Sequence, residues 1–444
     1  MTREKKKVAF ITLGCPKNTV DSEIMLNDLV ENGFEITDQE EEAQIIVINT
    51  CAFINDALEE SIQNIIQAGK LKEHGTEKII VAGCLSKRYG LDVFKELPEV
   101  DAIVDTANCL NISKAIKDSY EKDQTAYIGN KIDIDYLNNK RIYDPRLPYE
   151  YIKIAEGCSN NCTFCIIPKL RGGYKSRKQE NIIDECKAVI DSGKKELIII
   201  AQDTANYGID LYQSRKLHEL VSSIAQLDSS VMVRVLYTYP EFLYDELFDM
   251  YKHPNVARYM DIPIQHVCDD IRDKMNRKEN LAFITEKIKK VKAMYPDIYI
   301  RTSMITGFPG ETEEHFQKML EFVKSDLIDF AGIFMFSPQE GTLAESMPDQ
   351  VDDDVKQRRH EELYNAVTLK LTERVKNSIG KTFTVLCDGV SDDGIFYQGR
   401  TWFQAPEIDT IVYFTSEDEV NTGDFVQVKI LNHQQTDFIG EVIQ

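Results

Sequence analysis

The sequence predicts an α/β protein with three domains. Residues 1–145 are expected to form an N-terminal α/β domain with a parallel sheet, residues 146–375 a partial (β/α)6 barrel, and residues 376–444 a small OB-like β-barrel. Three observations support this prediction: β-branched runs alternate with amphipathic stretches at the start, six strand–helix units follow, and five short strands with tight turns end the chain. A chain of 444 residues is also too long for one hydrophobic core.

Composition and charge narrow the class of protein. Hydrophobic residues make up 43% and charged residues 28%, as in globular proteins, and the ten cysteines are scattered in a way that favours an intracellular protein with metal chemistry. The net charge of −22 disfavours nucleic acid and anionic membranes and favours a basic partner. No apolar run approaches the roughly 20 residues of a membrane span. We interpret the run Val8–Leu13 as a buried strand rather than a signal peptide, so we expect a cytoplasmic protein.

The first domain shows alternating strand and helix patterns. Strands are expected at Val8–Leu13, Ile45–Asn49 and Ile79–Ala82, and helices at Asn18–Glu31 and Ile54–Lys70. This alternation indicates a parallel sheet with helices on both faces.

Two local features complete the first domain. Asn18 is the expected N-cap of the first helix, with Asp21 in its first turn. Residues 120–148 carry little hydrophobic periodicity and several Asp, Asn and Pro residues, so we interpret them as a linker.

Three cysteines follow the three predicted strands of this domain. Cys15, Cys51 and Cys84 each come directly after a strand. Because the carboxyl ends of parallel strands line one edge of a sheet, these cysteines are expected to meet there. A single cysteine is most often a small buried hydrophobe, but three at equivalent strand ends predict a metal site with three protein ligands. Four further cysteines lack such placement and are expected to be structural: Cys109, Cys186, Cys268 and Cys387.

A tighter cysteine run opens the predicted barrel. Cys158, Cys162 and Cys165 lie within eight residues, in a loop after the strand Tyr151–Ala155. Three ligands suit a [4Fe–4S] cube with one open iron, whereas zinc would need a fourth Cys or His nearby, and none follows closely. Three crowded thiols with no metal are the remaining alternative.

The barrel prediction depends on six strands separated by helices. The active site of such a barrel lies at the carboxyl ends of its strands, where the cysteine loop also lies. The expected strands are Tyr151–Ala155, Glu196–Ala201, Val231–Leu236, Ala257–Ile262, Ile298–Ser303 and Phe330–Phe336. The expected helices are Gln179–Ser192, Lys216–Gln226, Glu241–Tyr251, Leu281–Ala293 and Glu313–Lys324.

The last 69 residues change to short alternating strands. The expected strands are Phe383–Leu386, Ile395–Gln398, Ile411–Phe414, Phe425–Ile430 and Phe438–Val442. Residues 376–444 include four basic and eleven acidic residues, which gives a net charge of −7. Such a domain should repel phosphates and attract a protein rich in lysine and arginine.

The run Cys158-x3-Cys162-x2-Cys165 resembles the signature of the radical S-adenosylmethionine (SAM) superfamily. This resemblance implies a [4Fe–4S] cluster on these three cysteines, with SAM bound at the open iron and Phe164 near the adenine. It also implies that one-electron reduction of SAM yields methionine and a 5′-deoxyadenosyl radical, which takes hydrogen from an unactivated carbon.

Three N-terminal segments resemble the methylthiotransferase family of that superfamily: Gly14–Glu23, Asn49–Ile54 and Ala82–Leu85. The resemblance covers nearly the whole chain, and the C-terminal barrel has the position of the family's TRAM domain. It implies a second [4Fe–4S] cluster on Cys15, Cys51 and Cys84, which holds a sulfur species at its open iron.

The resemblance extends to loops that follow predicted barrel strands. The segments at 201–204, 307–312 and 337–342 are similar to methylthiotransferase loops that hold SAM. They imply SAM contacts for Gln202, Asp203, Gly307 and Gly310, although turn chemistry alone explains glycines at such places.

Three other polar residues near these loops are less informative. We expect His266 to be a satisfied structural histidine. Arg171 and Arg177 either meet an anion, such as the carboxylate of SAM or of a substrate, or cap the adjoining helix.

Two branches of the family differ in substrate. The opening Gly-Cys-Pro-Lys-Asn with Val-Asp-Ser-Glu resembles the branch that modifies the β-carbon of an aspartate in the twelfth small-subunit ribosomal protein. The transfer-RNA branch, which modifies an adenosine, tends to carry Gly-Cys-Gln-Met-Asn there. Ribosomal proteins are strongly basic, so the acidic C-terminal domain independently favours the first branch.

The predicted function is therefore methylthio transfer to that aspartate, with an electron donor such as flavodoxin or ferredoxin. The alternatives are the transfer-RNA reaction and a non-enzymatic iron–sulfur sensor that binds a ribosomal partner. The product of the reaction separates the first two, and 5′-deoxyadenosine formation separates the enzymes from the sensor.

Overall fold

The computed structural model describes residues 5–443. The chain folds into two compact units. Of the described residues, unit 1 comprises 5–143, 153–177 and 337–345, and unit 2 comprises 144–152, 178–336 and 346–443. The α/β class, the parallel N-terminal sheet and the closed C-terminal barrel are confirmed.

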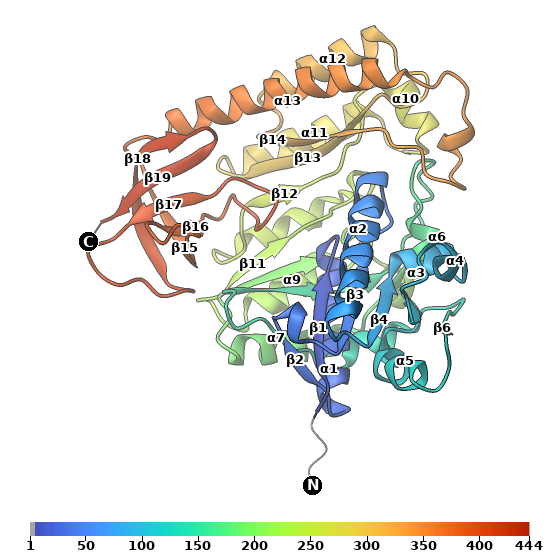
Figure 1. Cartoon of the computed structure of the whole chain (residues 1–444). Coiled ribbons are helices and arrows are strands. Elements are labelled where there is room, and N and C mark those ends of the chain that lie inside the picture. Colours follow the sequence, from blue (N-terminus) through green and yellow to red (C-terminus); the bar gives the residue numbers. More distant parts are fainter. Residues whose placement is uncertain (1–4, 444) are drawn as a thin grey trace. The chain divides into compact units, whose positions relative to one another are not determined.

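The core of unit 1 is a six-stranded parallel sheet (Figure 1). Its order is β2 (Glu35–Thr37), β1 (Lys7–Thr12), β3 (Ile45–Thr50), β4 (Lys78–Gly83), β5 (Ala102–Asp105) and β6 (Thr125–Tyr127). Every residue of β3 and β5 is buried, as expected for parallel strands covered on both faces. The predicted strands correspond to β1, β3 and β4, and the predictions missed the short strands β2, β5 and β6.

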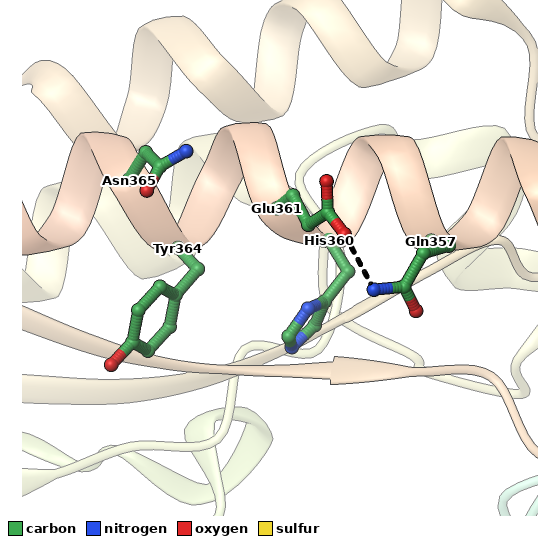
Figure 2. Close-up of a pocket in the computed structure, with 5 residues that line it drawn as sticks. All are labelled: Gln357, His360, Glu361, Tyr364 and Asn365. Atoms are coloured by element: carbon green, nitrogen blue, oxygen red, sulfur yellow. Dashed lines mark hydrogen bonds between the residues drawn. The ribbon is translucent and has the colours of Figure 1, made fainter.

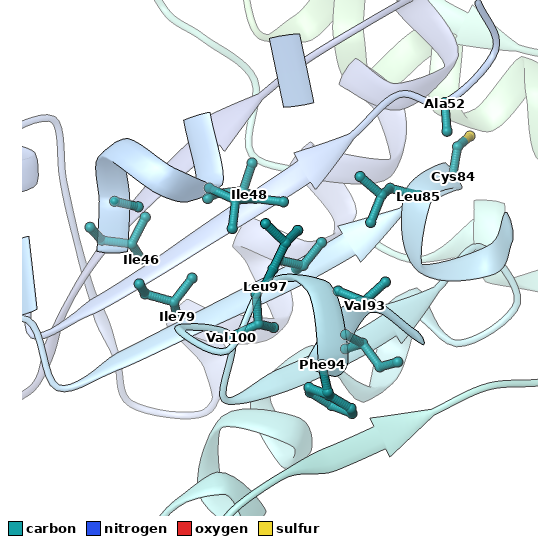
Figure 3. Packing of buried hydrophobic residues seen from close by; sticks show 14 of the residues in the cluster. Ile46, Ile48, Ala52, Ile79, Cys84, Leu85, Val93, Phe94, Leu97 and Val100 are labelled. Carbon is teal, nitrogen blue, oxygen red and sulfur yellow. The ribbon is translucent and has the colours of Figure 1, made fainter. Parts of the chain in front are cut away.

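Helices cover this sheet. The helices are α1 (Pro16–Glu31), α2 (Asn55–Leu71), α3 (Cys84–Tyr89), α4 (Asp92–Glu96) and α5 (Ile112–Ser119), with short 3-10 segments η1 (Glu40–Glu42), η2 (Lys72–His74), η3 (Cys109–Asn111) and η4 (Ile134–Asn138). Figure 3 shows the apolar side of β3 and β4 packed against Leu85, Phe94 and Leu97. Cys84 and Ala52 lie at one end of this core.

Two local predictions for unit 1 are wrong. Asn18 does not cap α1, because the helix begins at Pro16 with Cys15 as its N-cap, so Asp21 lies beyond the first turn. Proline is favourable at this first helical position, where its missing N–H is not needed. The predicted linker is also structured: Thr125–Tyr127 forms the edge strand β6, and Tyr136 and Arg141 are buried.

Unit 1 also contains the cysteine loop of the central segment. Two short antiparallel strands flank it, β8 (Ala155–Glu156) and β9 (Lys175–Ser176). Helix α6 (Ile167–Arg171) follows the third cysteine of the run, with Pro168 in its first turn.

Unit 2 holds two three-stranded sheets of the incomplete barrel, β11-β10-β7 and β12-β13-β14, joined by a bridge between Val233 and Val256. The strands are β7 (Tyr149–Lys153), β10 (Glu196–Ile200), β11 (Met232–Val235), β12 (Tyr259–Asp261), β13 (Tyr299–Thr306) and β14 (Phe330–Met335). These are the six strands that the sequence predicts, with small shifts of their ends.

Four of the five helices predicted for the barrel are present: α7 (Gln179–Asp191), α9 (Leu217–Ala225), α11 (Leu281–Met294) and α12 (Glu313–Lys324). The predictions missed the short helices α8 (Ile209–Tyr212) and α10 (Asp269–Lys274) and the 3-10 segment η7 (Ala344–Ser346). The helix expected at Glu241–Tyr251 is instead two 3-10 segments, η5 (Pro240–Phe242) and η6 (Asp245–Lys252). The break occurs because Leu243 leaves the helical region, with φ −75° and ψ 85°.

A long helix that the predictions missed, α13 (Asp353–Lys376), precedes the C-terminal barrel. The barrel closes in the order β15 (Thr382–Val390), β16 (Tyr397–Arg400), β17 (Val412–Thr415), β19 (Asp437–Val442) and β18 (Phe425–Gln434) (Figure 1). Its neighbouring strands are antiparallel except for β17 and β19. This five-stranded arrangement confirms the predicted OB-like domain.

A buried ion-pair network joins this barrel to the strands of unit 2. Glu196, at the start of β10, receives one hydrogen bond from Arg234 Nε and another from Arg400 Nη1, each at 2.6 Å. Arg400 also pairs with Asp388, and Arg234 Nη1 donates to the backbone oxygen of Trp402 at 2.7 Å. The two arginines hold the pKa of Glu196 below its ordinary value despite the opposing effect of burial.

Candidate functional site

Strand register brings the first three candidate cysteines together. Thr50 of β3 pairs with Gly83 of β4, so the next residues, Cys51 and Cys84, leave neighbouring strands at the same level. On the other side of β3, β1 pairs with it up to Thr12, and Cys15 follows three residues later. Cys84 and Cys15 both contribute to the raised pKa of Cys51, and Cys15 contributes to the raised pKa of Cys84, in agreement with three thiols gathered at this sheet edge.

Two glycines allow the close approach of these chain segments. Gly14 has φ +94°, and a Cβ there would lie 2.6 Å from Cys51 Cβ. Gly83 has φ +90°, and a Cβ there would lie 2.3 Å from Asn49 Oδ1. Both positions therefore require glycine, for backbone conformation and for space.

The three thiols differ in acidity. Burial raises the pKa of Cys51 to about 12, with a further contribution from Cys84 and Cys15, and burial also raises the pKa of Cys84. Burial acts on Cys15 too, but the cations Lys17 and Arg171, together with backbone hydrogen bonds from Asn18 and Lys17, lower its pKa. Since metals bind thiolates, occupation of this trio would release protons.

The donor set of this trio fits an iron–sulfur cube. It consists of three cysteines that form no disulfide, with Cys51 and Cys84 7% and 5% exposed. All-thiolate ligation is typical of iron–sulfur clusters, and three ligands leave one iron open.

The second cysteine run is shaped by backbone contacts. The backbone N–H of Cys158 donates to Gly172 O at 3.1 Å, and that of Cys165 donates to Cys162 O at 3.1 Å. Gly157 has φ +74°, and a Cβ there would lie 2.4 Å from Gly173 O. The loop therefore folds tightly, with all three cysteines and Phe164 partly exposed. Three thiol donors in one tight loop also fit a cube with one open iron.

A buried network of charges lies between the two cysteine trios of unit 1. Arg171 Nη1 donates to Asp21 and, at 3.4 Å, to Glu156, and its Nη2 donates to Asn18 Oδ1 and toward Cys84 Sγ at 3.7 Å. Lys153 pairs with the same two carboxylates, Asp21 and Glu156. The two cations thus balance the two carboxylates in a site with almost no access to water.

Tyr136 completes this network. Its hydroxyl lies 2.8 Å from Asp21 Oδ1 and 2.7 Å from Glu156 Oε2, and it accepts a hydrogen bond from Lys153 at 2.8 Å. Although burial opposes ionisation, Lys153 and Arg171 lower the pKa of Glu156 to about 2. Glu156 also accepts from Gly157 N at 3.0 Å, so the network is anchored directly beside the second cysteine run.

The loop 337–345 also belongs to unit 1. Arg88, on the helix that begins at Cys84, donates to Gln339 Oε1 at 2.8 Å and to Ala52 O at 2.9 Å. The backbone N–H of Ala344 donates to Thr163 O at 2.9 Å. This loop therefore contacts chain segments next to cysteines of both trios.

The other predicted site residues lie in unit 2. Gln202 and Asp203 follow β10, and Asp203 Oδ2 accepts from Asn206 at 3.1 Å. Gly307 and Gly310 follow β13 with φ +76° and +81°. Turn geometry already requires glycine at both positions, and their SAM contacts stay a prediction.

His266, predicted to be a structural histidine, contacts the loop after β13. It is fully buried, its Nδ1 accepts from Cys268 N at 3.0 Å, and its Nε2 lies 3.4 Å from Glu311 Oε2. Glu311 in turn accepts hydrogen bonds from Gly307 N and Arg359, so it organises the glycine loop. Sequence reasoning overlooked this role of Glu311, although the residue lies inside the segment 307–312.

Cys109, Cys186, Cys268 and Cys387 are all buried. Ligand atoms of Cys268, Asp270 and His315 lie within 4.8 Å of one another. However, His315 Nδ1 accepts the backbone N–H of Thr312 in a helix cap, which leaves the ring proton on Nε2, facing Asp270 at 3.2 Å. With a proton on Nε2, that nitrogen has no lone pair for a metal, so we do not assign a metal site to this group.

A hollow of about 390 Å³ runs along α13 (Figure 2). Gln357 donates to Glu361 at 2.7 Å, and His360 Nε2 bonds to Ile333 O at 3.2 Å beside the stacked ring of Tyr364. The hollow contains none of the candidate site residues.

The charged network is the part of the site that sequence reasoning missed. Arg171 is the last residue of α6, and its buried guanidinium lies on Asp21, Glu156, Asn18 and Cys84. A usable signal existed for Glu156 alone, because it directly precedes the cysteine loop.

Comparisons with known proteins agree with this arrangement. Sequence profiles of three families match the chain: Uncharacterized protein family UPF0004 over residues 7–105, the Radical SAM superfamily over 152–323 and the TRAM domain over 379–443. Among solved structures, the radical SAM methyltransferase TsrM from Kitasatospora setae matches with a TM-score of 0.58 at 11% identity, over 77% of this chain and 74% of that one. At this identity the likeness shows a shared fold.

The fold and these matches define a radical SAM enzyme with a TRAM domain, a class that uses SAM and [4Fe–4S] clusters. Two relatives are named ribosomal protein uS12 methylthiotransferase RimO. The one from Acetivibrio thermocellus is 43% identical over 99% of both chains, and the one from Clostridioides difficile is 43% identical over 98% of this chain and 99% of its own. The chain belongs to this RimO family of radical SAM methylthiotransferases. Within residues 5–443, no helix is both long and apolar enough to cross a membrane.

Proposed function

We propose that this chain transfers a methylthio group to the β-carbon of an aspartate in ribosomal protein uS12. The observation that carries the proposal is the convergence of two cysteine trios on one segment of unit 1. Arg171 donates toward Cys84 of the first trio, and the next residue, Gly172, accepts from the backbone of Cys158 in the second. The name shared by the relatives favours the ribosomal-protein reaction over the transfer-RNA reaction and over a sensor.

Each trio has a separate task in this proposal. Cys158, Cys162 and Cys165 would hold the cluster that binds SAM, near Phe164, and Cys15, Cys51 and Cys84 would hold the second cluster. Gln202, Asp203, Gly307 and Gly310 remain the proposed SAM-binding residues of unit 2. When bound, these groups supply one-electron chemistry, a radical that abstracts hydrogen, and the sulfur and methyl to be transferred.

The residues of the chain hold and shield these groups. Gly14, Gly83 and Gly157 let backbone segments approach each other closely enough to form the two thiol sites. Four buried charged residues near the thiols form ion pairs with one another and exclude water: Asp21, Lys153, Glu156 and Arg171. A site with little water protects a reactive radical from side reactions.

The acidic C-terminal barrel supports a basic protein substrate. Arg400 is buried against Glu196 and Asp388, so its charge is not available at the surface. The exposed basic residues of 376–444 are Lys376, Lys381 and Lys429. The exposed acidic ones are Asp392, Asp393, Glu407, Glu417, Asp418, Glu419, Asp424 and Glu441, so the exposed charge remains negative, with a balance of −5. A negative surface favours a basic protein over nucleic acid.

Three further points belong to the same proposal. A one-electron donor such as flavodoxin or ferredoxin reduces the enzyme, and the reaction takes place in the cytoplasm with its ribosomal substrate. The domain limits at 145 and 375 are retained, supported by family matches that fall at 7–105, 152–323 and 379–443.

The test is a product assay under anaerobic conditions. The reconstituted protein is incubated with SAM, a reductant and either uS12 or unmodified transfer RNA, and both are analysed by mass spectrometry. We expect a methylthio group on one aspartate of uS12 and unchanged RNA. Modified RNA with unchanged uS12 would favour the transfer-RNA reaction, and binding of uS12 without 5′-deoxyadenosine would favour a sensor.

A further inference from the structure

We propose that Arg171 is a positioning residue that raises the reduction potential of the cluster held by Cys15, Cys51 and Cys84. This inference rests on the proposed function, because it takes that trio as a cluster site. It assigns a specific task to a residue that is far from this trio in the sequence.

The geometry of the guanidinium supports the assignment. Its two ends face different partners: Nη1 is fixed by the carboxylates of Asp21 and Glu156, whereas Nη2 points to Asn18 Oδ1 and Cys84 Sγ. The carboxylates hold the planar fork so that one N–H remains directed at the sulfur, 3.7 Å away. Asn18 is itself fixed, since its Nδ2 donates to Leu13 O and Thr50 O at 2.9 and 3.0 Å.

The electrostatic consequence has a definite sign. A reduced cluster carries one more negative charge than an oxidised one, and a hydrogen bond from a cation to a ligating sulfur stabilises that charge. Removing Arg171 would also leave Asp21 and Glu156 with only Lys153 as a cation, so the surroundings would become more negative. Both effects lower the reduction potential.

The same contact explains why the residue acts on one cluster more than on the other. The guanidinium donates directly toward the Cys84 thiol. Its contact nearest to the second cysteine run is a hydrogen bond to Glu156, which lies two residues before Cys158. Partners of metal ligands commonly tune the metal through such contacts.

The experiment isolates the first trio. The experiment uses the full-length protein in which Cys158, Cys162 and Cys165 are all changed to Ala. Its iron content is measured, and a redox titration followed by EPR gives the midpoint potential of the remaining cluster. Arg171→Gln is expected to shift the midpoint to a more negative potential. Arg171→Lys, which keeps the charge but not the fork, should give a smaller shift in the same direction.

Arg141→Gln is the matched control, because Arg141 is also buried and pairs with Glu23 on the same helix α1. It should leave the midpoint unchanged. An unchanged midpoint in Arg171→Gln with full iron content overturns the inference. If Arg171→Gln fails to assemble a cluster, an unchanged midpoint potential in Arg171→Lys overturns the inference instead. Absence of iron in the background protein itself would instead contradict the cluster site, and with it the proposed function.

Discussion

Cys51 and Cys84 are held side by side by strand register, since Thr50 and Gly83, the last residues of β3 and β4, are paired neighbours. The sheet therefore sets the spacing of two thiols before any metal binds. Gly14 brings the third cysteine to them by lying directly against Cys51. Such preorganisation reduces the ordering that metal binding must otherwise bring about.

Gly14→Ala should disrupt the first trio selectively. The new Cβ would lie 2.6 Å from Cys51 Cβ, so Cys51 or the loop must move. We expect iron content to fall from about eight to about four atoms per chain, since the site of the second run is untouched. Iron analysis after anaerobic reconstitution measures this.

Gly33→Ala is the control for backbone strain. Gly33 has φ +89°, close to that of Gly14, but a Cβ added there would meet no atom within 4 Å. Both variants should lose roughly 1 kcal/mol of stability from the positive φ. Equal iron content in the two variants would mean that the contact with Cys51 does not matter for the site.

Glu196→Gln should loosen the contact between the C-terminal barrel and the strands of unit 2. It leaves Arg234 and Arg400 buried with a weaker partner, which should cost about 3–5 kcal/mol at pH 7. Trp402 is the single tryptophan, and its carbonyl accepts from Arg234, so urea unfolding followed by its fluorescence reports this region.

The pH dependence of this effect has a predicted sign. The pKa of Glu196 is lowered in the folded chain, so its pairing contributes fully above the ordinary glutamate pKa of about 4.3 and is lost as the pH falls through the folded pKa. The difference between wild type and Glu196→Gln should therefore shrink below about pH 4. The exposed Glu286 provides the control. Glu286→Gln should have the same stability as wild type at pH 7 and below about pH 4.

Charge reversal on the C-terminal barrel should weaken substrate binding. Changing Glu417, Asp418 and Glu419 to Lys is expected to reduce affinity for uS12 roughly tenfold at low salt, with a smaller loss at high salt. Titration of labelled uS12 at two ionic strengths measures both.

Changing Glu40, Glu41 and Glu42 to Lys tests whether binding depends on charge at the barrel or on the net charge of the whole protein. These three residues are also consecutive and exposed, and they lie in unit 1. This control should bind uS12 nearly as wild type does. If both triple variants lose affinity equally, only the total charge matters, and the barrel has no special role in binding.

Much of the fold was predictable because its signals are local. The β-branched runs at Ile45–Thr50 and Lys78–Gly83 show the parallel strands, and the order of strand and cysteine then predicts where the thiols meet. The capping prediction for Asn18 failed because tertiary contacts with Leu13, Thr50 and Arg171 use its side chain instead.

The charged network was not predictable in this way. Arg171 and Asp21 are 150 positions apart, and nothing in either local pattern indicates that they pair. The short strands β5 and β6 were missed for a related reason: Ala102–Asp105 and Thr125–Tyr127 are too brief to show a period and depend on the neighbouring strands.

The most direct test of the account compares Cys158→Ala and Cys51→Ala in one anaerobic assay with SAM, reductant and uS12, measuring 5′-deoxyadenosine and the mass of uS12 together. We expect Cys158→Ala to produce neither 5′-deoxyadenosine nor modified uS12, because the SAM-binding cluster is lost. Cys51→Ala should still produce 5′-deoxyadenosine while leaving uS12 without a methylthio group. Transfer of the methylthio group by Cys51→Ala at the wild-type level would contradict the division of labour between the two cysteine trios.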